Sequence, residues 1–566
     1  RTFCCGGGKK RLMLVTLLAW LYISFVSFSW GAIFLYVVKS EREAPGQFFT
    51  RCLAGLAVVG ILLGWLSLFM ALGHPMIQLV LFIPPLIFWI VLPGQRRSAV
   101  SQVAALFGGM KWYAVVLMSL TLVLILVMST WYISHPDTLG YHAQTIRWIE
   151  EYPAVPGLVH LSPRMGYQGL WYVVCAGFSF PFVHAEALTY VNTAVLFWLV
   201  LFFGRKISDT SSQQASAILW TFLLAFALWD YNYIRLTASS ASNDFVTGIY
   251  VWAAVYLFAG STRSAQDLLL ILLFSVFAIT LKLSVFPILL LAAMAVFLQG
   301  RSQAKWLWVS VLLIVVVMVP FLARNVITSG YLLYPSPFPD LFAVDWKLDH
   351  ASTVLEKQYI SAWARIPGTD HAHAVAVLDM PPGEWVPHWW ALRTLPEKFL
   401  LILTSLMLVV TLVRYRLIRS APQRHQFTLL ILLTGIVSWW MLAPDPRFSI
   451  GFTIPFLAIL LLLNFPVSGI TVPKTVLPIL CVILAAAIAG YSAYRVKNYF
   501  EWKHLVTPSG TRQQLYETMN CRGIIMTVPL VNDCGDQPVP CLKGDCGSIQ
   551  PRGAVAQDGF RSSWKK

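Results

Sequence analysis

Long apolar segments recur along the whole chain. Many runs of about 17 to 25 mostly apolar residues are long enough to cross a hydrocarbon layer of about 30 Å. Alternation of period two is absent, which disfavours a transmembrane β-barrel. The pattern predicts an all-α polytopic membrane protein. We expect about fourteen transmembrane helices, near 13–37, 52–72, 75–93, 112–133, 187–204, 216–230, 245–260, 266–281, 284–299, 304–323, 396–413, 426–442, 449–465 and 476–494.

The composition agrees with this class. Of 566 residues, 58% are hydrophobic and 12% are charged, and the mean hydropathy is +0.68. The formal net charge of +16 is explained by basic loops that set the orientation in the membrane. A nucleic-acid-binding role would need a contiguous basic face on a soluble domain, and the sequence offers none. We also expect Met13 to be a natural first residue.

Lysine and arginine gather in one set of short loops. These residues are Arg96, Arg97, Lys111, Arg205, Lys206, Arg263, Arg301, Lys305, Arg414, Arg416, Arg419 and Arg424. Under the fourteen-helix count all of these loops fall on one side, which is therefore expected to be cytoplasmic. The Asp137 loop, the loop 324–395 and the tail then lie outside, in the periplasm of a bacterium whose inner membrane holds the chain.

Five regions follow from this topology. We expect three transmembrane helices with a cytoplasmic loop (1–111), a transmembrane core with the first periplasmic loop 134–186 (112–323), a large periplasmic loop (324–395), C-terminal transmembrane helices (396–494) and a small cysteine-containing periplasmic tail (495–566).

The first outer loop carries a carboxylate at the depth where the chain leaves the bilayer. Charged groups at this depth are costly unless they have a task or a partner. A helix from residue 136 would place Asp137, Tyr141, Gln144 and Trp148 on one polar and aromatic face, which suits sugar binding. The alternative is that Asp137 only caps the helix. Further along this loop, we expect 165–182 to be a half-buried interfacial helix.

Other charged residues fall at the outer ends of later segments. Asp244 adds a second carboxylate, although the same stretch could simply cap a helix. Arg324 and Arg447 could hold a phosphate. Alternatively, Arg324 could snorkel to lipid headgroups and Arg447 could pair with Asp445. Lys282 is expected to meet a carboxylate or a lipid phosphate.

Two further groups of residues could bind metal or form covalent links. His371 and His373 could bind a metal ion or simply be solvated. Cys521, Cys534, Cys541 and Cys546 gather in the tail, where an oxidising compartment favours one or two disulfides with three open pairings. A zinc site is the alternative for the cysteines, but no CxxC motif is present.

Together these loops resemble the GT-C superfamily of membrane glycosyltransferases, which use polyprenyl-phosphate sugars. The resemblance is carried by His135-Pro136-Asp137 with Tyr141-His142, by Arg324-Asn325 with Gly330-Tyr331 and Tyr334-Pro335, and by Pro444-Asp445-Pro446-Arg447-Phe448. The chain is also similar to uncharacterised bacterial GT-C-like membrane proteins whose tail resembles residues 533–541. The likeness spans roughly 112–545.

The resemblance implies an enzyme that transfers a sugar from a polyprenyl-phosphate donor to a glycan, lipid or protein of the cell envelope. We expect this transfer to proceed with inversion at C1. It makes Asp137 the catalytic base and Arg324, Arg447 and Lys282 candidates for a phosphate clamp. The expected substrate-binding residues are Tyr141, His142, Gln144, Trp148, Asp244, Lys282, Arg324, Tyr334 and Arg447. Many members carry an acidic pair where Thr138 follows Asp137 here, so dependence on a divalent metal ion stays open.

Three other functions stay open from the sequence. A ligase or polymerase would move a whole lipid-linked oligosaccharide and would need a wide outer groove. A transporter would show internal repeats and charges in mid-membrane, and neither pattern is evident here. A structural subunit with a degenerate site is the third alternative.

Overall fold

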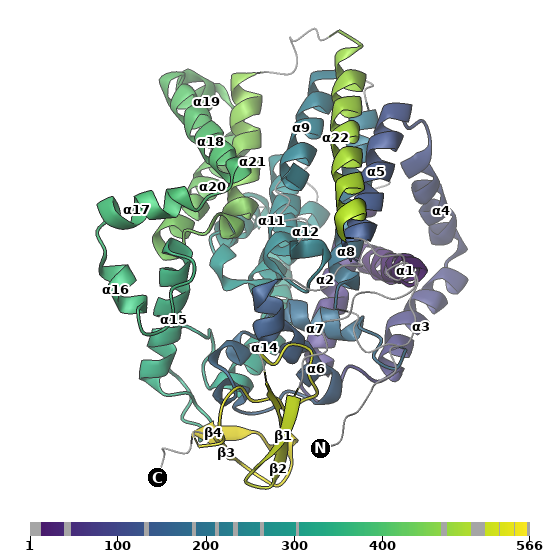
Figure 1. Cartoon of the computed structure of the whole chain (residues 1–566). Helices are drawn as coiled ribbons and strands as arrows, with labels where there is room; N and C mark the ends of the chain where they lie inside the picture. The colour runs from purple at the N-terminus through teal and green to yellow at the C-terminus, as the bar shows by residue number, and fades with distance from the viewer. Residues whose placement is uncertain are drawn as a thin grey trace.

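The computed structural model describes residues 13–38, 47–129, 135–183, 188–209, 214–229, 236–260, 265–300, 305–465, 473–499, 516–530, 533–547 and 549–562. Helices dominate it, and the strands are confined to the C-terminal tail (Figure 1). The tail lies at one end of the molecule beside α6, and α19 lies at the opposite end (Figure 1).

The N-terminal half contains most of the central helices. Their bounds are α1 Met13–Val37, α2 Gln47–Leu66, α3 Met76–Val91, α4 Pro93–Phe107, α5 Trp112–Ser129, α6 Ala143–Glu151, α7 Leu170–Gly177, α8 Tyr190–Ser208, α9 Gln214–Trp229, α11 Asp244–Ala259, α12 Ala265–Leu281, α13 Ile288–Gly300 and α14 Lys305–Ser329.

The remainder of the chain adds further helices and the tail. Its elements are α15 His350–Arg365, α16 Ala374–Asp379, α17 Pro382–Ala391, α18 Leu395–Val413, α19 Arg416–Ser420, α20 Gln423–Leu442, α21 Pro446–Asn464, α22 Val476–Tyr499, β1 Tyr516–Cys521, β2 Ile524–Pro529, β3 Ile549–Pro551 and β4 Phe560–Ser562.

The apolar helices are those of a multi-pass membrane protein. Each of the fourteen expected segments overlaps a helix, but in the described part of the chain only nine helices are long and apolar enough to cross a membrane alone. The expected span at 75–93 is α3, which meets α4 at a bend of 105° and raises the number to ten if the pair counts as one span. Helices α9, α11, α12 and α13 have only 13 to 17 residues.

Glycines allow the first two helices to lie against each other. A Cβ at Gly31 would lie 2.1 Å from the Arg51 carbonyl oxygen, and one at Gly55 would lie 1.6 Å from that of Ser27. Small residues at such crossings let backbones approach closely, as is common between membrane helices. The pair α1 and α2 then packs against α7 and α8 in the buried apolar core.

Two expected boundaries differ from the structure. Helix α14 continues to Ser329, so residues 324–329 belong to a helix and not to the outer loop. The expected half-buried interfacial helix at 165–182 is instead the short helix α7, and all of its residues are buried. Glycine Gly169 precedes α7, and a Cβ there would lie 2.7 Å from the Leu281 carbonyl oxygen. This close approach places α7 inside the molecule.

The tail forms two antiparallel hairpins, which an all-α assignment does not include. Strand β1 pairs with β2, and β3 pairs with β4. The disulfide prediction is confirmed, and of the three pairings left open the structure has Cys521–Cys546 and Cys534–Cys541. The cysteines Cys52, Cys175 and Cys481 are free and are buried in the apolar core of the helices.

Candidate functional site

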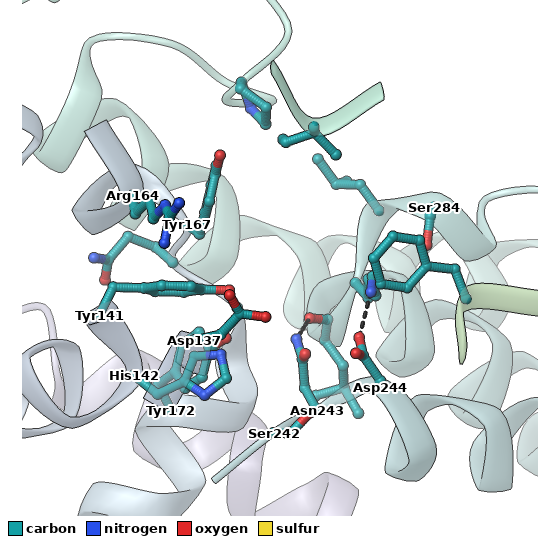
Figure 2. Close-up of a pocket in the computed structure, with 18 of the residues that line it drawn as sticks. Asp137, Tyr141, His142, Arg164, Tyr167, Tyr172, Ser242, Asn243, Asp244 and Ser284 are labelled. Atoms are coloured by element: carbon teal, nitrogen blue, oxygen red, sulfur yellow. Dashed lines mark hydrogen bonds and ion pairs between the residues drawn. The ribbon is translucent and has the colours of Figure 1, made fainter. Parts of the chain in front are cut away.

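A cavity of about 350 Å³ lies where the ends of several helices meet. Its walls come from the segment after α5, from the 164–172 stretch, from the start of α11, from the α12–α13 junction and from α15 and α21. Seven residues singled out from the sequence line it, namely Asp137, Tyr141, His142, Asp244, Lys282, Tyr334 and Arg447. Figure 2 shows Asp137, Tyr141 and His142 facing Asn243 and Asp244 across this cavity.

A π-helical turn presents the first wall of the cavity. It spans Thr138–His142 and leads directly into α6. The ring nitrogen Nδ1 of buried His135 accepts a hydrogen bond from the backbone N–H of Asp137 at 3.1 Å. Thr138 Oγ1 and His142 Nδ1 lie 2.9 Å apart. Such π-turns are rare and are frequently found at functional sites.

The π-turn divides the four residues that the sequence was expected to place on one polar face. Its wider turn breaks the ordinary helical spacing, so Asp137 and Tyr141 face the cavity while Gln144 and Trp148 do not line it. Gln144 donates to the backbone oxygens of Gly535 and Gln537 in the tail, at 3.1 and 2.8 Å. Trp148 is buried in an apolar cluster shared with the tail. The expectation that all four residues share one face is therefore wrong.

A cluster of opposite charges fills the other side of the cavity. The guanidinium of Arg447 lies 3.4 Å from the Asp137 carboxylate, 3.6 Å from Asp445 and 3.8 Å from Asp244. Lys282 forms an ion pair with Asp244 and lies 3.4 Å above the centre of the Phe448 ring. Arg447 thus bridges Asp137 and Asp244, two carboxylates from distant segments. It also pairs with Asp445, which was the alternative to a phosphate-binding role, and it lines the cavity at the same time.

The turn before α21 fixes the position of this arginine. Asp445 is the N-cap of α21, and its side chain accepts from the Arg447 backbone N–H at 3.1 Å. Pro446 occupies the first position of α21, where the helix needs no backbone N–H for its own hydrogen bonds. The indole N–H groups of Trp389 and Trp439 donate to the carbonyls of Pro444 and Asp445, at 2.5 and 2.6 Å.

Ionisation at the π-turn is set by burial and by this cluster. Burial opposes the charge on Asp137, but Arg447, with the two nearby histidines, outweighs it and holds the pKa of the carboxyl well below its usual range. Burial, with His135 nearby, lowers the pKa of His142 to about 3, so this imidazole is neutral at ordinary pH. Burial, with the Asp137 charge nearby, raises the pKa of Tyr141.

The cavity also contains residues that the sequence did not single out. Arg164 donates to the Tyr359 hydroxyl at 2.6 Å, and both line the cavity together with Tyr167 and Trp363. The Arg447 guanidinium lies 4.9 Å from the centre of the Trp363 ring. The signal available for Arg164 was a lone arginine in a mostly apolar stretch of the first outer loop.

Arg324 has a different surrounding from the one expected. Its side chain is 2% exposed and donates to Ser67 Oγ at 2.9 Å and to Gln168 Oε1 at 2.8 Å. It does not line the cavity, although the next residue, Asn325, does. This arginine joins the ends of α2 and α14 to Gln168, two residues before α7. The carbonyl end of α2 favours a positive charge there.

The two candidate metal-binding histidines, His371 and His373, are held by carboxylates. His371 Nε2 lies 2.7 Å from buried Glu356, and His373 Nδ1 lies 2.7 Å from Asp370. Glu356 also accepts a hydrogen bond from the cavity residue Tyr167. Among the residues that the structure describes, no group of three or more His, Cys, Asp or Glu side chains could hold a metal ion. The donor set therefore gives no support for a divalent ion.

Comparison of the chain with curated proteins and with solved structures found no match. One family does match, over residues 13–454, and its description is Domain of unknown function (DUF8201). The matched region includes all the cavity-lining residues and ends within α21, before the tail. Because the match covers well over half of the chain, the protein belongs to this family.

Proposed function

We propose that this protein is a GT-C-type membrane glycosyltransferase. It transfers a sugar from a polyprenyl-phosphate donor to a glycan, lipid or protein of the cell envelope, in a cavity that faces the periplasm of a bacterial inner membrane. The observation that carries the proposal is the cavity of about 350 Å³ in which Asp137 lies 3.4 Å from Arg447. Fourteen membrane-crossing segments, counting the shorter helices, are part of the same proposal.

The side chains around this cavity suit a phosphate and a sugar. Arg164, Lys282 and Arg447 supply three cationic groups, and a guanidinium can hold a phosphate through two parallel hydrogen bonds. Aromatic rings that suit the flat faces of a sugar line the same space, namely Tyr141, Tyr167, Tyr172, Tyr359 and Trp363. A donor headgroup of one sugar and one phosphate therefore has partners for both of its parts.

The proposed reaction needs one base and several cations. The Asp137 carboxylate takes the proton of an acceptor hydroxyl, whose oxygen attacks C1 of the donor sugar. A new C1–O bond forms as the bond between C1 and the phosphate oxygen breaks, with inversion at C1. The electron pair leaves with polyprenyl phosphate, and Arg447 and Lys282 stabilise its growing charge.

The Asp137–Arg447 pair gives this reaction an order. While Arg447 faces Asp137, the carboxylate is a weak base, because its pKa lies well below the usual range. A donor phosphate that draws Arg447 away removes the main charge that lowers this pKa. Asp137 therefore becomes a stronger base when the donor is bound, and it remains too weak to deprotonate an acceptor while the donor is absent.

The test is donor turnover by the purified full-length protein in lipid vesicles. The probes are undecaprenyl-phosphate sugars, offered as a panel with a cell-envelope extract as acceptor, and the readout is release of undecaprenyl phosphate. Replacing Asp137 with Asn should lower turnover by about 100-fold or more, the usual contribution of a general base. Binding of undecaprenyl phosphate should weaken in Arg447→Gln and should be retained in Asp137→Asn.

Two results contradict the proposal. Undiminished turnover in Asp137→Asn, at equal folded protein, removes the catalytic role of this carboxylate. Movement of the intact donor across the vesicle membrane without cleavage at C1 would instead assign the protein to transporters. As a control, Lys347→Gln changes a cation that pairs with Asp340 outside the cavity, and it should leave turnover unchanged.

A further inference from the structure

The C-terminal tail contacts the segment that carries Asp137. The backbone N–H of Gly535 donates to the carbonyl of Leu139, inside the π-helical turn, at 2.9 Å. Gln144, in the first turn of α6, donates to the carbonyls of Gly535 and Gln537. These bonds join residues almost 400 positions apart, and the tail lies beyond the region matched by the family.

An ion pair adds to these backbone contacts. Arg147 of α6 donates to both carboxylate oxygens of Asp536, at 2.7 and 2.9 Å. The side chains are only 13% and 4% exposed, so solvent screens the pair little. Arg147 also donates to buried Glu150 at 2.8 Å, and these two carboxylates raise the pKa of the arginine although burial opposes this.

The contacting residues belong to a loop that is closed covalently. The disulfide Cys534–Cys541 closes it, and Gln537 donates back to the Cys534 carbonyl at 3.1 Å. The loop is also joined to strand β2, because the Thr527 N–H donates to the Pro540 carbonyl at 2.9 Å. A closed loop presents its carbonyls and Asp536 to α6 with little freedom left to lose on binding.

A second anchor holds the tail through residues that do not line the cavity. Arg552 donates to both oxygens of Asp345, at 2.9 and 3.1 Å. The Phe560 N–H donates to the Pro156 carbonyl at 3.0 Å. Besides the apolar cluster that it shares with Trp148, the tail thus has two described groups of polar contacts, and of these the group at residues 534–541 reaches the π-turn.

We propose that the disulfide-closed loop Cys534–Cys541 is a positioning element that holds the π-turn Thr138–His142, and with it Asp137, against Arg447. Asp536 is its central positioning residue and acts through Arg147. A π-turn is a rarer conformation than the α-helix it leads into, and the tail supplies it with a hydrogen-bond partner from outside its own helix. The catalytic consequence rests on the proposed function, but the positioning itself does not.

The test compares hydrogen–deuterium exchange in Asp536→Asn and Asp345→Asn, both as the full-length protein in lipid nanodiscs. Each variant weakens one two-oxygen arginine pair of the tail. We expect the amides of residues 138–147 to exchange about tenfold faster or more in Asp536→Asn, as loss of a charged hydrogen-bonded partner should allow. They should be unchanged in Asp345→Asn, and Asp536→Glu should restore part of the protection.

The amides of the β1–β2 hairpin report whether the tail is still folded. Unchanged exchange at 138–147 in Asp536→Asn, with the hairpin protected, overturns the proposal. Equal acceleration in both variants also overturns it, because any loss of tail docking would then suffice. If turnover is measurable, Asp536→Asn should lower kcat more than it raises the donor KM. Faster exchange at 138–147 with no turnover of any donor, even by the unmodified protein, would reject the glycosyltransferase and leave the positioning role standing.

Discussion

At the scale of single residues, the pairing of Asp137 with Arg447 dominates the site. Three carboxylates lie within 4 Å of the Arg447 guanidinium, at 3.4, 3.6 and 3.8 Å. Removing one partner of a buried ion pair leaves uncompensated charge, which costs more than the pair itself contributes. Arg447 therefore supports both the fold around the cavity and the ionised state of Asp137.

Replacing Arg447 with Gln should destabilise the protein by about 3 to 5 kcal/mol at pH 7, as for other broken buried pairs. Arg447 lowers the pKa of Asp137 against the effect of burial, so its loss raises that pKa. In the unmodified protein the lowered pKa contributes stability above the unfolded carboxyl value of about 4, and this contribution is lost only as the pH falls towards the still lower folded pKa. In the variant, burial without Arg447 raises the pKa of Asp137 above the unfolded value, so the cost of ionising this carboxyl grows as the pH rises from about 4 to 7. The difference from the unmodified protein should therefore be larger at pH 7 than at pH 4.

Thermal unfolding in detergent between pH 4 and pH 8 measures this difference. The double variant Asp137→Asn with Arg447→Gln serves as the control, and it should be more stable at pH 7 than Arg447→Gln alone. A gap between Arg447→Gln and the unmodified protein that does not change with pH would contradict the assigned coupling.

His142 gives a second residue-scale prediction. Its pKa is lowered to about 3 by burial and by His135, whereas an unfolded histidine titrates near 6.5. The unfolded chain then binds a proton that the folded protein does not, so stability falls as the pH drops from about 6.5 towards 3. Replacing His142 with Asn should remove part of this fall in the unfolding midpoint. A pH dependence equal to that of the unmodified protein would contradict a neutral, buried His142.

At the scale of elements, the turn before α21 depends on two tryptophans from other helices, Trp389 of α17 and Trp439 of α20. Replacing Trp439 with Phe removes the donor to the Asp445 carbonyl. A buried carbonyl left without its donor costs about 1 to 3 kcal/mol, and the Arg447 position should loosen. We expect weaker binding of undecaprenyl phosphate and a lower unfolding midpoint. Trp440→Phe, at a neighbouring indole that is 36% exposed, is the matched control and should change both quantities less.

The elements also show what apolar patterning can and cannot predict. Each of the fourteen expected segments overlaps a helix, because each is a long run of apolar residues, but nine of the described helices are long and apolar enough to cross a membrane alone. Patterning ended one helix at residue 323, since Arg324 is charged, whereas α14 continues and buries that arginine against Ser67 and Gln168. Patterning also assumed one helical period through residues 137–148, and the π-turn at Thr138–His142 breaks that period.

At the scale of the whole molecule, four of the five charged residues that line the cavity could be predicted, but their neighbours could not. Asp137, Asp244, Lys282 and Arg447 were singled out because charge beside apolar segments is costly. The contacts of the tail with α6 were not predictable, since Asp536 carries no signal in sequence of its partner Arg147. Arg164 was missed for the same reason, because its cavity partner Tyr359 lies on α15.

The arrangement of the two ends leads to a prediction of topology. The tail strands and α6 lie at one end of the molecule, and α19 lies at the opposite end (Figure 1). The basic residues Arg416 and Arg419 belong to α19, and such residues are retained on the cytoplasmic side. A tail on the other side would be exposed to oxidising conditions, which agrees with its two disulfides.

Single cysteines at the exposed positions Thr518 and Ser420 test this orientation in intact cells whose outer membrane has been made permeable. The background has Cys4 and Cys5 replaced by Ser, and the free cysteines Cys52, Cys175 and Cys481 are buried. A membrane-impermeant maleimide should label Thr518→Cys at once and Ser420→Cys only after lysis. The reverse pattern would put Asp137 and the tail in the cytoplasm, where thiols are kept reduced. The cavity could then not reach a periplasmic acceptor. The disulfide that closes the loop beside the π-turn could not persist either.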